Sequence, residues 1–395
     1  MRLLHTSDWH LGRPFHGASL IQDQAAALDR IVELAAEAEV DAVLIAGDIY
    51  DRAIPPAEAV ALFNDTLARL SRGGVAVVAI AGNHDSHVRV SIYDPLLSAF
   101  GVTIRGDVRR AHEPVLVSPR RGGGPVAIYP LPYLEPAVDG PPLQPEPEAA
   151  GADGQGRISH QQVTRWALAA IQRDLHTRPA HRSVLVAHTF VAGGEPSESE
   201  RQLSIGNVDR VSVDTFAGFN YVALGHLHGS QQLDGPRVAY SGTPLPYSFS
   251  EQHHTKSVRL VELDAAGNPT VEVVPLGVGR PLRTLEGPLE SLCQEPRYAR
   301  AADAWLRVVL TDELLPLQAM ARLRQRFPHV AELRHRPPEV QRSSASARNQ
   351  QVRQARSSLE LAMAFFADQQ GRAPSEAEAA LVRQALSAAA GGGER

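Results

Sequence analysis

Short apolar runs alternate with amphipathic helical patterns through the first hundred residues of the chain. Residues 2–5 are predicted as a short strand, and the mostly apolar segments 41–46 and 75–81 as strands that are buried on both faces. Between them, apolar residues at helical spacing predict helices over about 21–39 and 56–70, the second with Pro in its first turn. This βαβαβ order is typical of an α/β fold with a parallel sheet.

The following part of the chain is richer in predicted strands. Apolar segments on either side of the Arg-Arg-Gly-Gly-Gly sequence at 120–124 predict a hairpin. Residues 135–157 are crowded with Pro, Gly, Ala and acidic residues, which predicts a mobile surface insertion. One helix is expected at 159–175. Further strands are predicted over 183–187, 221–224, 238–241, 258–263 and 271–275.

The charge of the chain changes sign after residue 279. Residues 280–356 contain 14 Arg and 8 acidic residues, a net formal charge of +6, whereas the whole chain carries −5. Apolar segments within 305–334 predict a strand–helix–strand module. We therefore expect one large domain over residues 1–279 and a small, basic α+β domain over 280–340.

Residues 341–395 are expected to form a polar, Arg-rich linker followed by a helical tail. Two short amphipathic helices are predicted there, and each begins with a capping-box pattern: Ser357 with Glu360, and Ser375 with Glu378. Such helices cannot bury an apolar face alone, so they dock on a partner or pack against the chain's own core. The separating linker favours the partner.

The overall composition excludes several classes of protein. With 43% hydrophobic and 21% charged residues, the chain resembles ordinary soluble globular proteins, and its apolar runs are far shorter than the about 18 residues needed to span a membrane. No signal peptide is expected. The single cysteine, Cys293, excludes an internal disulfide and fits a cytoplasmic location. The only lysine, Lys256, lies outside any P-loop pattern, so no such ATP site is expected.

Metal-binding residue types follow the carboxyl ends of the predicted strands, where ligands gather in open α/β sheets. They are Asp8, His10, Asp48, Asn83, His188, His226 and His228. A single His or Gly-Asp at a strand end is usually structural, but recurrence at five strand ends indicates a metal centre. Oxygen and imidazole ligands without thiolate disfavour a structural zinc site and permit Mn²⁺, Fe²⁺ or catalytic Zn²⁺. Seven such residues suit two ions that share a carboxylate and hold a phosphate between them.

Five segments of the chain resemble, in order, the motif set of the calcineurin-like metallophosphoesterases. The segments are Asp8-Trp9-His10, Gly47-Asp48-Ile49-Tyr50-Asp51, Gly82-Asn83-His84-Asp85, His188 and Gly225-His226-Leu227-His228. The resemblance implies an α/β fold in which a β-sandwich is flanked by helices in four layers. It also implies two divalent ions, with Mn²⁺ expected: Asp8, His10 and His228 bind one ion, Asp48 bridges, and Asn83, His188 and His226 bind the second.

The same resemblance implies roles for residues beside the ligands. His84 matches a histidine that contacts the phosphate or protonates the leaving oxygen, and Asp85 is its expected orienting partner. Asp51 lies where related nucleases can carry a histidine that positions the scissile phosphate, and Arg52 is a candidate phosphate contact. A solvated turn is the alternative for both. Trp9 is expected to pack beneath the metal loop.

Within this superfamily, further segments resemble the nuclease subunits that act with an SbcC-type coiled-coil ATPase. They are His5-Thr6-Ser7-Asp8-Trp9-His10-Leu11-Gly12 and Ser241-Gly242-Thr243-Pro244. The resemblance implies ATP-dependent exonuclease action on double-stranded DNA ends and endonuclease action on single strands and hairpins, in DNA repair and recombination. It also implies a homodimer within a two-plus-two heterotetramer, with no membrane association.

Two other functions stay open from the sequence. A phosphatase or phosphodiesterase of the same superfamily, acting on a small molecule or a protein, is one alternative. The more than 100 residues beyond residue 279 argue against a minimal phosphatase. A non-catalytic scaffold for DNA ends is the other alternative, and the intact set of ligand-type residues argues against it.

Overall fold

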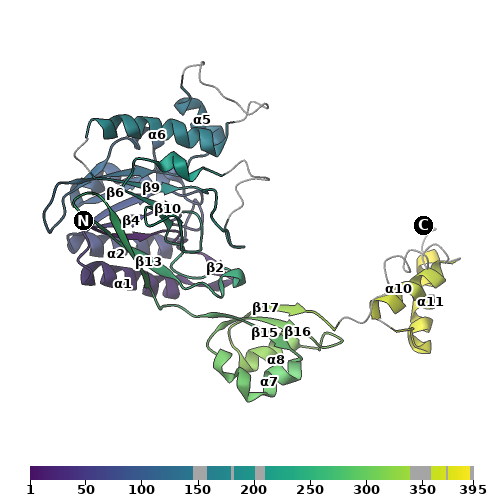
Figure 1. The fold of residues 1–395 in the computed structure, drawn as a ribbon. Helices are drawn as coiled ribbons and strands as arrows, with labels where there is room; N and C mark the ends of the chain where they lie inside the picture. The colour runs from purple at the N-terminus through teal and green to yellow at the C-terminus, as the bar shows by residue number, and fades with distance from the viewer. Residues whose placement is uncertain (146–157, 179–181, 201–209, 339–356, 371, 392–395) are drawn as a thin grey trace.

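Two six-stranded sheets pack face to face between outer helices in the computed structural model shown in Figure 1. The structure describes residues 1–395 apart from 146–157, 179–181, 201–209, 339–356, 371 and 392–395. The predicted four-layer α/β architecture is confirmed. No helix within the described ranges is long and apolar enough to cross a membrane.

The first sheet has the strand order β14–β13–β1–β4–β5–β6. The bounds are Pro269–Pro275, Ser257–Leu263, Arg2–Thr6, Ala42–Ile45, Ala76–Ile80 and Val102–Arg105. Strands β1, β4, β5 and β6 are parallel, whereas β13 and β14 are antiparallel to their neighbours. The carboxyl ends of β1, β4 and β5 therefore lie at one edge.

The second sheet has the strand order β11–β12–β10–β9–β8–β7. The bounds are Gln231–Asp234, Val238–Tyr240, Tyr221–Gly225, Arg182–His188, Val126–Leu131 and Val115–Val117. Strands β12, β10, β9 and β8 are parallel. Strands β7 and β8 form the antiparallel hairpin that the sequence predicts.

Apolar residues on both faces of each sheet explain the layering. Helices α1 (Ile21–Glu37) and α2 (Ala57–Arg72) cover the outer face of the first sheet, and α6 (His160–His176) covers that of the second. Between the sheets, fully buried residues such as Leu44 and Val186 form a separate core. Each buried aliphatic side chain contributes about 1.5–3 kcal/mol relative to its exposed state.

The prediction that residues 135–157 form a mobile surface insertion is partly wrong. Helix α5 (Pro136–Leu143) lies beside α6, and it begins at a proline, which helix starts favour. The rest of that segment lies mostly outside the described residues. Strand β6 was not predicted because Thr103 and Arg105 interrupt its apolar pattern, although both are buried.

Short elements complete the large unit. Their bounds are Pro14–Phe15 (β2), Ala18–Ser19 (β3), His87–Ser91 (α3), Asp94–Leu97 (α4), Ser98–Phe100 (η1), Val108–Arg110 (η2), Val213–Phe216 (η5) and Phe249–Glu251 (η6). Strands β2 and β3 pair as a small hairpin after the first metal loop.

Residues after 279 form a smaller α+β unit with its own core. A parallel sheet of β15 (Leu282–Gly287), β16 (Trp305–Leu310) and β17 (Val330–His335) packs against α7 and α8. The bounds of the helical segments are Leu289–Gln294 (α7), Pro296–Ala301 (η7) and Ala319–Arg326 (α8). Trp305 and Leu282 pack with Phe15 and Phe249, so this unit contacts the large one beside β2.

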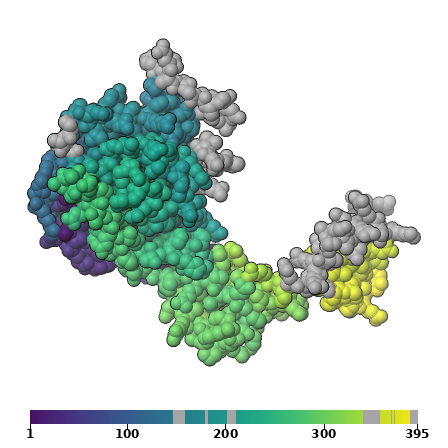
Figure 2. All heavy atoms as spheres, in the orientation of Figure 1, coloured from purple at the N-terminus to yellow at the C-terminus, as the bar shows by residue number. Residues whose placement is uncertain are grey.

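The helical tail consists of α10 (Ser358–Gln370) and α11 (Glu376–Gly391). The predicted capping box at the second helix is present: Ser375 N donates to Glu378 Oε2 at 2.7 Å, and Glu378 N donates to Ser375 Oγ at 3.4 Å. None of the tail side chains that the structure describes is buried. The tail lies away from the large unit (Figure 2). The linker predicted at 341–356 lies outside the described residues.

Candidate metal centre

The structure brings all seven predicted ligands together where the two sheets meet. The loops after β1, β4 and β5 come from one sheet, and the ends of β9 and β10 come from the other. Hydrogen bonds join the loops: Asp8 N donates to the Gly47 carbonyl at 3.0 Å, and His10 N donates to the Asp48 carbonyl at 2.9 Å. Residues far apart in the sequence therefore share one site.

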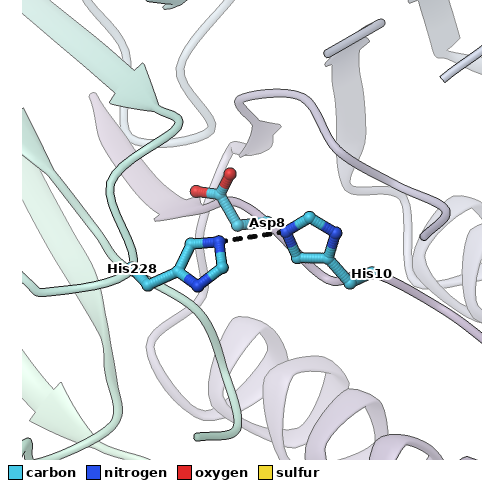
Figure 3. A group of neighbouring side chains, drawn as sticks. All are labelled: Asp8, His10 and His228. Atoms are coloured by element: carbon cyan, nitrogen blue, oxygen red, sulfur yellow. Dashed lines mark hydrogen bonds between the residues drawn. The ribbon is translucent and has the colours of Figure 1, made fainter. Parts of the chain in front are cut away.

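Asp8, His10 and His228 form the first ligand group (Figure 3). The Nε2 atoms of His10 and His228 lie 3.1 Å apart, and the Asp8 carboxylate lies beside them. All three side chains are completely or almost completely buried. Two imidazole nitrogens and a carboxylate directed at one point are a typical ligand set for a divalent transition-metal ion.

Asn83, His188 and His226 form the second group. Asn83 Oδ1 lies 2.9 Å from His188 Nε2 and 3.2 Å from His226 Nδ1. The ring of His188 is fixed from behind, because its Nδ1 donates to the Ala46 carbonyl at 2.9 Å. This hydrogen bond leaves the Nε2 lone pair free to face the centre.

Asp48 lies between the two groups. Its Oδ2 is 3.7 Å from His10 Nε2 and 3.5 Å from His188 Nε2. Its Oδ1 accepts a hydrogen bond of 2.8 Å from the backbone N–H of His84. A carboxylate in this position is suited to bridge two ions.

Four of the predicted ligands adopt backbone conformations that non-glycine residues rarely use. Asp8, His10, Asp48 and His226 have φ angles of 53°, 45°, 48° and 112°. Such conformations cost about 1–3 kcal/mol each and persist where the surrounding structure enforces them. Their concentration at one edge indicates that the loops are shaped for the site.

Glycines allow the loops to approach one another. A Cβ added at Gly82 would lie 2.2 Å from the Asp48 amide nitrogen, and one at Gly47 would lie 2.4 Å from His188 Nδ1. Gly47 also has a φ of 87°, which side chains disfavour. The glycines that precede Asp48 and Asn83 are therefore required by packing within the site.

The ionisation of these groups fits a bound cation. Burial, followed by the charges of neighbouring imidazoles, lowers the pKa of both His10 and His226 well below the usual value, so both rings keep a lone pair. Burial and the Asp48 charge raise the pKa of Asp8 well above its usual range. Two buried carboxylates among neutral imidazoles are stabilised when positive ions neutralise them. The residues present therefore fit two divalent metal ions.

His84 lies at the mouth of the centre, with its side chain 16% exposed. Its Nδ1 donates to the Asp51 carbonyl oxygen at 2.8 Å, and its Nε2 lies 4.0 Å from Asp48 Oδ2. The ring thus presents Nε2 toward the space between the ligand groups. The expectation that the Asp85 carboxylate orients this ring is wrong, because the carbonyl of Asp51 does so.

Asp85 instead joins two of the metal loops. Its carboxylate accepts hydrogen bonds from the backbone amides of Gly82, Ile49 and Tyr50 at 2.9–3.1 Å. Burial and the nearby Asp48 charge raise the pKa of Asp85 to about 7. Asp85 therefore stabilises the loop that carries Asp48, and we assign it no direct contact with the reacting groups.

Asp51 and Arg52 occupy different positions beside the centre. Asp51 Oδ1 lies 3.8 Å from His10 Nδ1 and 3.6 Å from Arg13 Nε. Arg52 is exposed to solvent, and its contact with phosphate stays a prediction. Trp9 is fully buried and donates to Thr6 Oγ1 at 2.9 Å, which confirms its packing role.

Several residues that support the site belong to no recognisable sequence motif. The Arg13 guanidinium lies 5.1 Å above the Tyr247 ring, and its Nη1 is buried without a hydrogen-bond partner among the described residues. Tyr247 in turn donates to the Trp9 carbonyl at 2.5 Å. Arg13 lies three residues after His10, and this short spacing is the sequence feature that could place it near the site.

Comparison with known proteins agrees with this geometry. Residues 1–129 match the calcineurin-like phosphoesterase family, and residues 278–370 match the family described as type 5 capsule protein repressor C-terminal domain. The fold and the site are those of a calcineurin-like metallophosphoesterase.

Curated relatives make the assignment narrower. The chain is 31% identical to SbcD, a component of the nuclease SbcCD, from Staphylococcus saprophyticus, over 84% of both chains. It is 32% identical to SbcD of Bacillus subtilis, over 85% of both chains, and 32% identical to SbcD of Escherichia coli K12, over 80% of this chain and 79% of the relative. The chain belongs to the SbcD family of metal-dependent nuclease subunits.

Proposed function

We propose that the chain is a Mn²⁺-dependent DNA nuclease that hydrolyses phosphodiester bonds at duplex ends and hairpins in a complex with an SbcC-type ATPase. The observation that carries the proposal is the pair of ligand groups on either side of Asp48. His84 lies beside them, with its Nε2 4.0 Å from Asp48 Oδ2, and we propose it as a group that acts on the phosphate rather than as a ligand. Cleavage at duplex ends is proposed to depend on ATP. The proposed role of the nuclease is in DNA repair and recombination in the cytoplasm.

The proposed ligands follow the observed grouping. Asp8, His10 and His228 would hold one ion, Asn83, His188 and His226 the other, and Asp48 both. Two bound ions supply Lewis-acid stabilisation of the phosphate and an activated water as nucleophile. The oxygen and nitrogen donor set is compatible with Mn²⁺.

His84 is proposed as the general acid. Its Nδ1–H is held by the Asp51 carbonyl, so a proton on Nε2 faces the reacting phosphate and can pass to the departing oxygen. Asp51 therefore contributes to the site through its backbone carbonyl, which holds the His84 ring. Its carboxylate lies near His10 and Arg13.

A comparison of substrates tests the proposed activity. We expect the purified protein to cleave hairpin and linear duplex DNA in Mn²⁺, and to lose this activity in EDTA, with little hydrolysis of a phosphomonoester. Parallel assays in Mg²⁺ and Zn²⁺ test the choice of ion. Activity confined to the phosphomonoester would favour the phosphatase alternative. No cleavage with Mn²⁺, ATP and the ATPase partner present would favour the scaffold.

An exposed apolar surface on α3, α4 and η1 supports the proposed homodimer. Val88, Ile92, Tyr93, Leu96 and Phe100 are 60–73% exposed, and we call these residues the 88–100 patch. All five lie within 13 consecutive residues of α3, α4, η1 and the turn between the first two. Soluble proteins seldom leave such a patch uncovered, and a second copy of the chain is the proposed cover.

The tail supports the proposed contact with a coiled-coil ATPase. Leu361, Phe365 and Leu381 are 42%, 66% and 65% exposed, and they lie on two helices that stand apart from both larger units. Helices that leave large apolar side chains unburied are suited to bind in the groove of a helical partner.

Light scattering of the isolated protein and of its complex separates the two proposed contacts. We expect an Ile92→Glu/Leu96→Glu variant to become monomeric yet still co-purify with the ATPase. We expect a variant that ends at residue 356 to stay dimeric and lose the ATPase. Each variant is the control for the other. A monomeric wild-type protein, or ATPase binding without the tail, would contradict the corresponding contact.

The smaller α+β unit is proposed as a capping domain that contacts DNA through its exposed arginines. Of the 14 arginines between residues 280 and 356, ten lie in the described part, together with seven acidic residues. Four exposed arginines are paired with glutamates: Arg297, Arg322, Arg334 and Arg336. The remaining exposed arginines, including Arg283 and Arg300, are the candidates for phosphate contact.

A further inference from the structure

A chain of buried polar side chains runs from His228 away from the metal centre. Ser199 Oγ lies 2.5 Å from His228 Nδ1 and 2.5 Å from Glu251 Oε1. The other oxygen of Glu251 accepts a hydrogen bond from Lys256 Nζ. Lys256 also donates to the His228 carbonyl at 3.0 Å and to Thr243 Oγ1 at 2.7 Å. The only lysine of the protein is thus committed to this network.

Every member of this network is shielded from water. Glu251 is 1% exposed, His228 1% and Ser199 8%, and the Lys256 side chain is 9% exposed. Burial of a carboxylate and an ammonium is unfavourable unless they are paired and their remaining hydrogen-bonding capacity is satisfied. Both conditions are met here, so the network is a specific arrangement rather than an incidental surface contact.

The positions of the hydrogens follow from counting donors. An ionised carboxylate has none, so the hydroxyl proton of Ser199 must lie on the bond to Glu251. Ser199 Oγ can then only accept from His228, which places a proton on Nδ1. A further neighbour, Ser197 Oγ at 2.9 Å, does not change this count, because it donates to Glu200 Oε2 at 2.8 Å.

The tautomer that results is the one a metal ion requires. With a proton on Nδ1, Nε2 of His228 carries a lone pair, and this atom is the one that faces His10 and Asp8. The backbone of His228 is held by the same loop, since its N–H donates to Glu200 Oε1 at 2.8 Å. His10 has no equivalent support, because its Nδ1 has no hydrogen-bond partner in the described part of the chain.

We propose that Ser199 and Glu251 are positioning residues that hold His228 in its metal-binding tautomer and orientation, with Lys256 as the fixed countercharge of Glu251. The inference rests on the proposed role of His228 as a ligand of the first ion. Partners of this kind orient the ligand and raise its basicity, and their loss typically weakens metal binding about 10–100-fold. The serine hydroxyl here connects the histidine to a carboxylate that the ring does not reach, at 3.7 Å.

Two substitutions address the network with little change of shape. Ser199→Ala removes the hydroxyl that accepts from His228. In Glu251→Gln, the NH₂ group replaces one of two acceptor oxygens: one accepts from Ser199 and the Tyr247 N–H, the other from Lys256. With the amide oxygen facing the Lys256 cation, the NH₂ group faces Ser199 and turns the hydroxyl proton toward His228. The His228 proton then lies on Nε2, and a protonated Nε2 cannot bind the ion. We expect both variants to bind one of two Mn²⁺ ions about 10–100-fold more weakly, with the other ion unaffected.

Titration of metal-free protein with Mn²⁺, with free Mn²⁺ followed by electron paramagnetic resonance, measures both affinities directly. Asp174→Asn on α6 is the matched control. Its carboxylate also accepts from a hydroxyl, that of Tyr129 at 2.8 Å, and pairs with a cation, Arg178 at 2.9 Å, but it lies outside the metal loops. This control should bind both ions normally. A Ser199→Thr variant, which keeps the hydroxyl, should retain most of the affinity.

The outcomes distinguish the positioning network from the metal centre itself. Normal affinity for both ions in Ser199→Ala and Glu251→Gln, together with loss of one ion in His228→Ala, would overturn the network and leave the centre intact. Two normally bound ions in His228→Ala, or none in the wild type, would overturn both. If circular dichroism shows that Glu251→Gln does not fold, Ser199→Ala decides, because it only removes one oxygen atom.

Discussion

An Asp48→Asn variant should lose binding of both metal ions and nearly all nuclease activity. Asp48 Oδ2 is within 3.7 Å of one nitrogen from each ligand group, and the substitution removes the negative charge that both groups share. Turnover should decrease by at least about 10²–10³-fold, the effect of removing one preorganised electrostatic contact in an active site. Mn²⁺ binding and cleavage of hairpin DNA should decline together.

Asp41→Asn is a matched control for this variant. Asp41 precedes the same strand β4 that Asp48 follows, it is also buried, and its carboxylate accepts backbone N–H bonds of 2.7 Å from Arg2 and Arg120. It lies at the opposite edge of the sheet, so it tests the cost of a buried Asp-to-Asn change without the centre. An Asp48→Asn protein that retains two ions and normal turnover would exclude a bridging role.

A His84→Gln variant, in contrast to Asp48→Asn, should keep both metal ions and lose most of its activity. No ligand atom is removed, so two Mn²⁺ ions should still bind, whereas kcat on DNA should fall by about 10²–10⁴-fold as expected for loss of a general acid. The defect should be much smaller on bis(p-nitrophenyl) phosphate, because p-nitrophenolate leaves without a proton. Steady-state rates on both substrates provide the measurement.

His87→Gln provides the control for His84, since it places the same substitution on the same segment outside the ligand groups. Equal rate losses of His84→Gln on DNA and on the activated ester would argue against proton transfer. They would instead support a role of the ring in holding the phosphate, which does not depend on the leaving group.

Much of the fold follows from local patterns in the sequence. Strands Ala42–Ile45 and Ala76–Ile80 are continuous apolar runs, each followed by Ala-Gly, and they are predicted to within two residues. The ligand residues at their ends could be found for the same reason, because parallel strands bring their carboxyl ends to one edge. Strand β6 was missed because its polar residues are paired inside the protein: Arg105 is buried with Asp94 at 3.3 Å.

The supporting contacts of the centre could not be predicted in this way. Asp85 follows His84 directly, yet its side chain turns toward backbone amides of another loop. Ser199 and Glu251 lie 29 and 23 positions from His228 and belong to no motif that marks them. Hydrogen bonds between loops depend on the final packing, and residue type alone does not reveal which loops meet.

The burial of Lys256 has a chemical consequence for the whole surface. Because it is the only lysine, every side-chain cation that meets solvent or DNA on the folded protein is an arginine or a histidine, and no lysine amine is freely available to acylating reagents. An amine-reactive probe would reach Lys256 only when the segment between Glu251 and Lys256 opens. Reactivity at that one atom thus reports on local opening beside the metal centre, without any engineered label.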